Sequence, residues 1–142
     1  LVSAFMSYTH NKAEYLGTGD TNVDAAVGIV PGNEVVNMPK TMYVASLDWR
    51  KGPFSAGISA KYTGQRFVNV SNTWQTEAYT TSDVYMNYVP ENLPQFMRGL
   101  EFNLVLNNIT DESYLGGISG GGAWIGAPRT VALSVTMDLD GA

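Results

Sequence analysis

The sequence predicts an all-β protein, an antiparallel meander of about six strands. Six segments alternate apolar and polar side chains with a period of two, and the helical i, i+3, i+4 spacing fits these segments less well. The connections between the segments are alternately long and short, as expected of strands that run back and forth through one sheet. Each segment therefore has one apolar face and one polar face.

The first three predicted strands cover Val2–His10, Thr41–Arg50 and Phe54–Thr63. The first has the weakest alternation, with Ala4, Met6 and Tyr8 on its more apolar face. Only Lys51-Gly52-Pro53 separates the second strand from the third, which indicates a tight turn. The apolar faces of these two strands are Tyr43, Ala45, Leu47 and Trp49, and Phe54, Ala56, Ile58, Ala60 and Tyr62.

The last three predicted strands cover Ser82–Val89, Leu100–Asn107 and Arg129–Leu139. Arg129–Leu139 has the clearest pattern, because every second residue from Val131 onward is a large apolar one. The apolar faces are Val84, Met86 and Tyr88; Leu100, Phe102, Leu104 and Leu106; and Val131, Leu133, Val135, Met137 and Leu139.

Three long loops, predicted at about residues 11–38, 64–81 and 108–128, fall at one end of the meander. Connections longer than roughly 15 residues are unusual in a compact soluble domain and commonly carry function. Long loops at one end and short turns at the other are typical of an outer-membrane β-barrel. Four aromatic residues near strand ends on the apolar face fit the interfacial girdles of such a barrel: Tyr43, Trp49, Tyr62 and Tyr88.

Composition excludes several classes of function. Charged residues are 15% of the chain, below the roughly 25% usual in soluble domains, and the net charge of −5 with scattered Lys and Arg argues against nucleic acid as a partner. Cys is absent and His10 is the single histidine, so neither a thiolate nor an imidazole cluster can hold a metal, and no cofactor is expected. Since no apolar run approaches the roughly 18 residues of a membrane helix, a membrane would be crossed by strands.

Four stretches carry a resemblance to a known family: VNMPKTMYVASLDW, GISAKYTGQRF, LEFNLVLNNITDESYL and IGAPRTVALSVTMDL. The third looks like an N-(N/L)-x-x-D-x-x-Y strand end, and the fourth like a G-x-P-R-x-x final strand. In this order and spacing, from Val36 to Leu139, they resemble the C-terminal end of the barrel of TonB-dependent outer-membrane receptors. The family's terminal aromatic residue is missing, and Leu139 is expected to replace it.

The resemblance implies that residues 1–142 are the C-terminal segment of a transmembrane β-barrel of about 22 strands, whose plug and N-terminal strands lie outside this sequence. It implies the outer membrane of a Gram-negative bacterium and energy-coupled uptake of a scarce nutrient such as a ferric siderophore. The implied partners are outer-membrane lipid, the nutrient, the energising inner-membrane TonB complex and the barrel-assembly machinery. Two alternatives stay open: a passive outer-membrane pore, either a porin or a secretion barrel, and a soluble β-sandwich that binds carbohydrate.

Two groups of residues are the candidate functional sites. We expect the outer loops to present ligand-binding side chains, namely Arg66, Asn69, Asn72, Trp74 and Trp124. We expect the polar faces of the strands to meet the lumen or the plug through Asp48, Arg50, Lys61, Glu101, Asn103 and Asp138. No catalytic constellation is predicted, because His10 has no evident partners and the carboxylates of Asp111 and Glu112 are expected to be solvated.

The glycine-rich stretch YLGGISGGGAWIGAPRT, residues 114–130, is predicted to be the last outer loop. It lacks the Lys-Ser/Thr of a phosphate-binding loop, and a strand follows it where that loop requires a helix. Its tryptophan, Trp124, is expected to touch either the ligand or a lipid headgroup.

Overall fold

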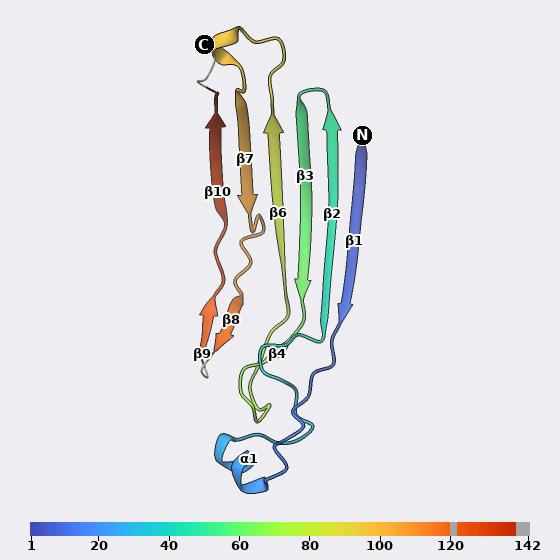
Figure 1. The fold of residues 1–142 in the computed structure, drawn as a ribbon, viewed down its shortest axis with the longest axis vertical. Coiled ribbons are helices and arrows are strands. Elements are labelled where there is room, and N and C mark those ends of the chain that lie inside the picture. Colours follow the sequence, from blue (N-terminus) through green and yellow to red (C-terminus); the bar gives the residue numbers. More distant parts are fainter. Residues whose placement is uncertain (120–121, 139–142) are drawn as a thin grey trace.

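The computed structural model describes residues 1–119 and 122–138, and its main element is a single antiparallel sheet (Figure 1). Six strands form the sheet in the order of the chain, and each pairs only with its neighbours in that order. They are β1 (Val2–His10), β2 (Thr41–Lys51), β3 (Phe54–Thr63), β6 (Tyr79–Tyr88), β7 (Glu101–Asn107) and β10 (Thr130–Thr136). The predicted all-β meander of six strands is confirmed.

Several strand boundaries differ from the prediction, and the largest differences are at the start of β6 and the end of β10. β6 starts at Tyr79, three residues before the predicted Ser82, because pairing with β3 continues as far as Thr63 opposite Tyr79. β10 ends at Thr136. The expectation that Leu139 replaces a terminal aromatic falls on a residue outside those that the structure describes.

The long connections all lie at one end of the sheet, which we call the loop end (Figure 1). Loop 1 covers residues 11–40 and contains helix α1 (Thr21–Val27). Loop 2 covers residues 64–78 and contains the paired strands β4 (Arg66–Phe67) and β5 (Gln75–Thr76). Loop 3 covers residues 108–129 and contains the paired strands β8 (Leu115–Ser119) and β9 (Gly122–Ile125). The strand pattern of the sequence did not predict this secondary structure within the loops.

The opposite end, which we call the turn end, has short connections. A two-residue turn at Gly52 and Pro53 joins β2 to β3, and Gly52 has a positive φ of 54° there. The connection from β6 to β7 contains only the short 3-10 helix η1 (Gln95–Met97). Long and short connections therefore alternate between the two ends, as predicted.

The register aligns the apolar faces of all six strands. One complete row of register partners crosses the whole sheet through Ala4, Leu47, Ile58, Val84, Leu106 and Val131. The adjacent row is Val2, Trp49, Ala56, Met86, Leu104 and Leu133. Ile58, on a central strand, is 46% exposed, and no described element covers this face. The buried apolar side chains of the described residues are Val68 and Ile118, and both lie in the loops.

Aromatic rings border the apolar face at both ends. At the loop end, Tyr43 lies between Tyr8 and Tyr62 with ring centroids 5.3 Å from each. At the turn end, Tyr88 stacks on Phe54 at 4.5 Å and lies 6.1 Å from Phe102. Tyr62 and Phe54 are separated along β3 by about 27 Å at roughly 3.4 Å per residue, and a strand tilt of roughly 35–45° would reduce this to about 19–22 Å along a membrane normal, near the ~25 Å height of the apolar band of an outer-membrane barrel. Among the described residues, no helix is long and apolar enough to span a membrane.

Candidate functional site

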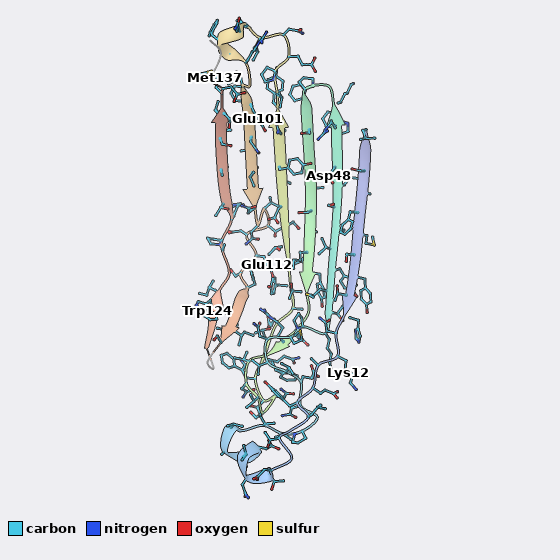
Figure 2. All side chains as sticks on the ribbon, viewed as in Figure 1. Lys12, Asp48, Glu101, Glu112, Trp124 and Met137 are labelled. Atoms are coloured by element: carbon cyan, nitrogen blue, oxygen red, sulfur yellow. The ribbon has the colours of Figure 1, made fainter. Side chains whose placement is uncertain are left out.

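The polar face of the sheet carries five of the six residues predicted to face a lumen. Asp48, Arg50, Lys61, Glu101 and Asn103 lie in strands, and their register partners place all of them on the face opposite the apolar rows. Figure 2 shows Asp48 and Glu101 on the sheet. The sixth, Asp138, lies beyond the end of β10, where its backbone N–H donates to the carbonyl of Arg98 at 3.2 Å. Its carboxylate lies against Gly99 at the turn end.

A hydrogen bond on this polar face spans three strands. The Tyr85 hydroxyl of β6 donates to Oδ1 of Asp48 in β2 at 2.7 Å, although β3 runs between them. The residue of β3 between the two side chains is Gly57, the register partner of both Asp48 and Tyr85. A Cβ atom at position 57 would collide with the Tyr85 ring and the Asp48 carboxylate, so this bridge requires glycine.

A second polar group lies nearer the turn end of the same face. The side-chain amide of Asn87 donates to Oε1 of Glu101 at 2.6 Å, and Asn87 is also the register partner of Asn103. The Oδ1 atoms of Asn87 and Asn103 are buried and accept no hydrogen bond among the described residues. Buried oxygens of this kind usually accept a hydrogen bond from water or from another polypeptide segment.

Loops 1 and 2 interlock through asparagine side chains. The Asn72 amide pairs with the backbone of Glu34, accepting from its N–H at 2.6 Å and donating to its carbonyl at 3.0 Å. Asn33 donates from its side chain to the carbonyl of Val70 at 2.9 Å. These bonds give the two loops a fixed relative position without a shared strand. The side chain of Asn72, predicted to contact ligand, is thus hydrogen-bonded to loop 1.

Arg66 joins all three loops. It is only 6% exposed, and its guanidinium donates to Oδ1 of Asn37 in loop 1 at 3.0 Å. The same group donates to the backbone carbonyls of Leu115 and Gly116 in loop 3, and the Gly116 bond measures 3.5 Å. Its Cζ atom lies 5.7 Å from the ring centroid of Tyr79 at the start of β6. The structure therefore places this predicted ligand contact inside the loop cluster.

An aromatic stack continues from Arg66 into loop 3. The Tyr79 ring stacks on the Tyr114 ring with centroids 4.2 Å apart. Gly126 lies against the Tyr114 ring, where a Cβ atom would overlap it. The backbone N–H of Gly126 donates to the Tyr114 carbonyl at 2.7 Å. Tyr114 and Gly126 belong to two of the motifs noted in the sequence, and the structure gives both a role in fixing loop 3.

The base of loop 3 is held by the remaining motif residues. Asn108 is buried; its amide nitrogen donates to the carbonyls of Glu112 at 2.9 Å and Ala127 at 3.1 Å, and its Oδ1 accepts from the Glu112 N–H at 2.9 Å. Asp111 accepts from the backbone N–H of Arg129 at 2.9 Å, and its carboxylate lies 3.9 Å from the Arg129 guanidinium. Asp111, expected to be solvated, has a side chain that is 52% exposed, and its carboxylate also joins the two limbs of the loop.

The other predicted ligand contacts divide into an internal residue and two exposed ones. Asn69 accepts from the backbone N–H groups of Thr73 and Trp74 at 3.0 and 3.1 Å, so it shapes the tip of loop 2. Trp74 and Trp124 are 48% and 58% exposed. Figure 2 shows Trp124 on the β8–β9 ribbon, away from the sheet. About half of each tryptophan is therefore accessible to a molecule in solution.

A cleft of about 430 Å³ opens between loops 2 and 3. Residues 75–79 line one side, and residues 112–115 with Ile125 line the other. Glu77 and Glu112 contribute one exposed carboxylate from each side, and neither forms an ion pair within the described part of the chain. This cleft could not be predicted from the sequence, because its two sides are far apart along the chain. Among the same residues, no group of three or more His, Cys, Asp or Glu could hold a metal ion.

Comparison with known proteins identifies several relatives. Residues 2–109 match the family model described as TonB dependent receptor-like, beta-barrel. The chain is 29% identical over 142 residues to the ferrichrome outer membrane transporter/phage receptor of Escherichia coli (strain K12), covering 96% of this chain and 18% of that protein.

Solved structures share the fold. The ferric citrate transporter FecA in the unliganded form aligns with a TM-score of 0.76 at 22% identity, over 96% of this chain and 21% of that one. The siderophore receptor PiuA from Acinetobacter baumannii aligns with a TM-score of 0.70 at 19% identity, over 94% of this chain and 19% of that one. The chain thus spans about a fifth of the length of these proteins.

Proposed function

Because the chain belongs to the β-barrel family of TonB-dependent receptors, we propose that it forms part of the wall of an outer-membrane receptor for energy-coupled nutrient uptake. In this proposal the apolar face of the sheet meets outer-membrane lipid, and the polar face lines the lumen and contacts a plug. The segment is assigned to the C-terminal part of the barrel, in a Gram-negative outer membrane.

The observation that carries the proposal is the continuous apolar face. Two complete rows of apolar register partners cross six strands, and aromatic rings border them at both ends. A sheet with one such exposed face and one polar face is suited to separating hydrocarbon from a water-filled interior. A sandwich would need a second layer on the apolar face, and no described element supplies one.

The proposed ligand is a scarce nutrient such as a ferric siderophore, by analogy with the ferrichrome transporter, which is 29% identical. Capture involves no covalent chemistry. Selection depends on differential binding by the outer loops, with the exposed Trp74 and Trp124 and the cleft between loops 2 and 3 as the contacts. Release into the periplasm would require the energising TonB complex, and insertion into the membrane would require the barrel-assembly machinery; both act on the complete receptor.

Uptake of radioactive ferrichrome by cells that carry the complete receptor, compared with cells lacking it, tests this function. The expected result is saturable uptake that stops when the proton gradient is dissipated. Uptake that is linear in concentration and insensitive to the gradient would instead indicate a passive pore. Recovery of the protein from water without detergent would indicate a soluble sandwich.

A further inference from the structure

We infer that Arg66 is a positioning residue, which holds loops 1, 2 and 3 together as one preassembled rim and does not itself contact the ligand. Arg66 is only 6% exposed, and the contacts that bury it all come from within the chain. The structural role of Arg66 is inferred from its contacts alone. Only the ligand-binding part of the test rests on the proposed function.

The acceptors of Arg66 come from parts of the chain that are far apart. Asn37 precedes it by 29 residues, and Leu115 follows it by 49. Arg66 itself starts the β4–β5 ribbon of loop 2, and Tyr79 beneath it belongs to the sheet. One side chain therefore touches each of the three loops and the top of the barrel wall.

Arginine is the residue type that this position needs. Its planar guanidinium presents five N–H donors in a fixed fork, so one group can serve acceptors in two directions while its Cζ atom lies over an aromatic ring. The ammonium of lysine cannot reproduce this arrangement. No carboxylate within the described residues forms an ion pair with Arg66. A buried cation without a counter-charge is stable only while its other partners stay in place, and this requirement couples the loops.

The position of loop 3 relative to loop 2 depends on Arg66 more than the position of loop 1 does. Loops 1 and 2 are also joined by the bonds of Asn33 and Asn72, which do not involve Arg66. Among the described residues, the side-chain hydrogen bonds and ring contacts that join loop 2 and the start of β6 to the β8–β9 ribbon are the Arg66 bonds to Leu115 and Gly116 and the stacking of Tyr79 on Tyr114. Removing the guanidinium should therefore release loop 3 from a rim in which loops 1 and 2 stay joined.

Distance measurements on the complete receptor test the inference. Spin labels on Val27→Cys in α1 and Ile125→Cys in β9 report on loops 1 and 3, and both side chains are exposed. The 142 residues contain no cysteine that would compete for label. We expect one narrow distance distribution in the parent and a broad one in Arg66→Met and in Arg66→Lys. Arg98→Met, the same change at an exposed arginine of the turn end, should leave the distribution narrow.

Ligand binding distinguishes positioning from direct contact. With ferrichrome as the probe, we expect Arg66→Met to weaken affinity about tenfold and to raise the KM of uptake with an unchanged maximal rate. Weaker affinity with a narrow distance distribution would show that Arg66 contacts the ligand, and this result would overturn the inference. The inference would also be overturned if neither the distance distribution nor the affinity changed. If the parent does not bind ferrichrome, the choice of nutrient fails while the distance result still decides the role of Arg66.

A milder variant covers the case in which Arg66→Met does not reach the outer membrane. Asn37→Gly removes one acceptor of Arg66 and keeps the positive φ of 62° accessible. We expect a smaller broadening of the same distance distribution. An unchanged distribution in this variant would contradict the link between loop 1 and Arg66.

Discussion

The sheet and the loops of this chain are stabilised in different ways. In the sheet, apolar side chains such as Ile58 and Leu133 point outward and stay exposed. In the loops, Val68 and Ile118 are buried, and side-chain hydrogen bonds connect segments that are distant in sequence. The apolar face of the sheet is left uncovered by the described residues, which fits its proposed contact with outer-membrane lipid, whereas the loops bury apolar side chains within the chain itself. Substitutions in the sheet and in the loops should therefore destabilise the protein for different reasons.

The largest expected effect comes from a charge at the middle of the apolar face. Ile58→Arg would place a guanidinium midway between the two aromatic borders, in the complete apolar row. We expect a loss of about 2–4 kcal/mol in folding stability in lipid, because a cation near the bilayer midplane loses its hydration. Ser59→Arg, on the next residue and the opposite face, should cost less than about 1 kcal/mol. Urea unfolding of the complete receptor in lipid vesicles measures both, and equal losses would contradict the assignment of faces.

A smaller loss is expected when a side chain is added inside the loop cluster. Gly126→Val would drive its Cβ into the Tyr114 ring, and overpacking of this kind costs about 1–3 kcal/mol. Gly122→Val is the matched control, because a Cβ there meets only the Ser119 carbonyl at an ordinary 3.7 Å. Hydrogen exchange of loop 3 peptides should accelerate in the first variant and stay near the parent rate in the second. The same acceleration in both would mean that the aromatic stack does not fix the loop.

Loss of the buried amide at the base of loop 3 should have a moderate effect. Asn108→Ala removes three side-chain hydrogen bonds and should destabilise the loop by about 2 kcal/mol. Asn92→Ala at the turn end is the control, because Asn92 also has a positive φ, 58° against 50° for Asn108, and is exposed. Exchange of the Glu112 amide measures the effect. If Asn92→Ala accelerated exchange of the Glu112 amide equally, the destabilisation could not be attributed to the lost hydrogen bonds of Asn108.

The smallest effect concerns the exposed indole of loop 3. Trp124→Ala should weaken ligand binding roughly tenfold, equivalent to about 1.4 kcal/mol, with unchanged stability. Trp49→Ala, at an aromatic position on the apolar face, should leave affinity unchanged and lower stability instead. Equilibrium binding of ferrichrome to the purified receptor provides the measurement. Unchanged affinity in Trp124→Ala would indicate a contact with lipid headgroups.

The sequence predicts the sheet well because its information is local. Alternation within β2 and β3 determines which residues share a face, and the tight turn at Gly52 fixes their register. The loop cluster could not be predicted in this way. Its bonds join residues such as Asn72 and Glu34, which are 38 positions apart and have no periodic pattern. The sequence marks Arg66 only as a candidate ligand contact, because its burial depends on Leu115 and Tyr79, and these contacts exist only after folding.

The two-residue connection between β2 and β3 has a consequence for the order of folding. Bringing the ends of a 30-residue segment such as loop 1 together costs about 2 kcal/mol more chain entropy than closing a two-residue turn. The β2–β3 hairpin is therefore the cheapest part of the sheet to nucleate, with ten register pairs to stabilise it once the turn closes. β1 and β6 can then add to its two edges. A substitution at Gly52 by a residue that does not readily adopt its positive φ should slow formation of this hairpin. The pairing of every other strand should then be delayed, while the structure of the complete sheet stays almost unchanged.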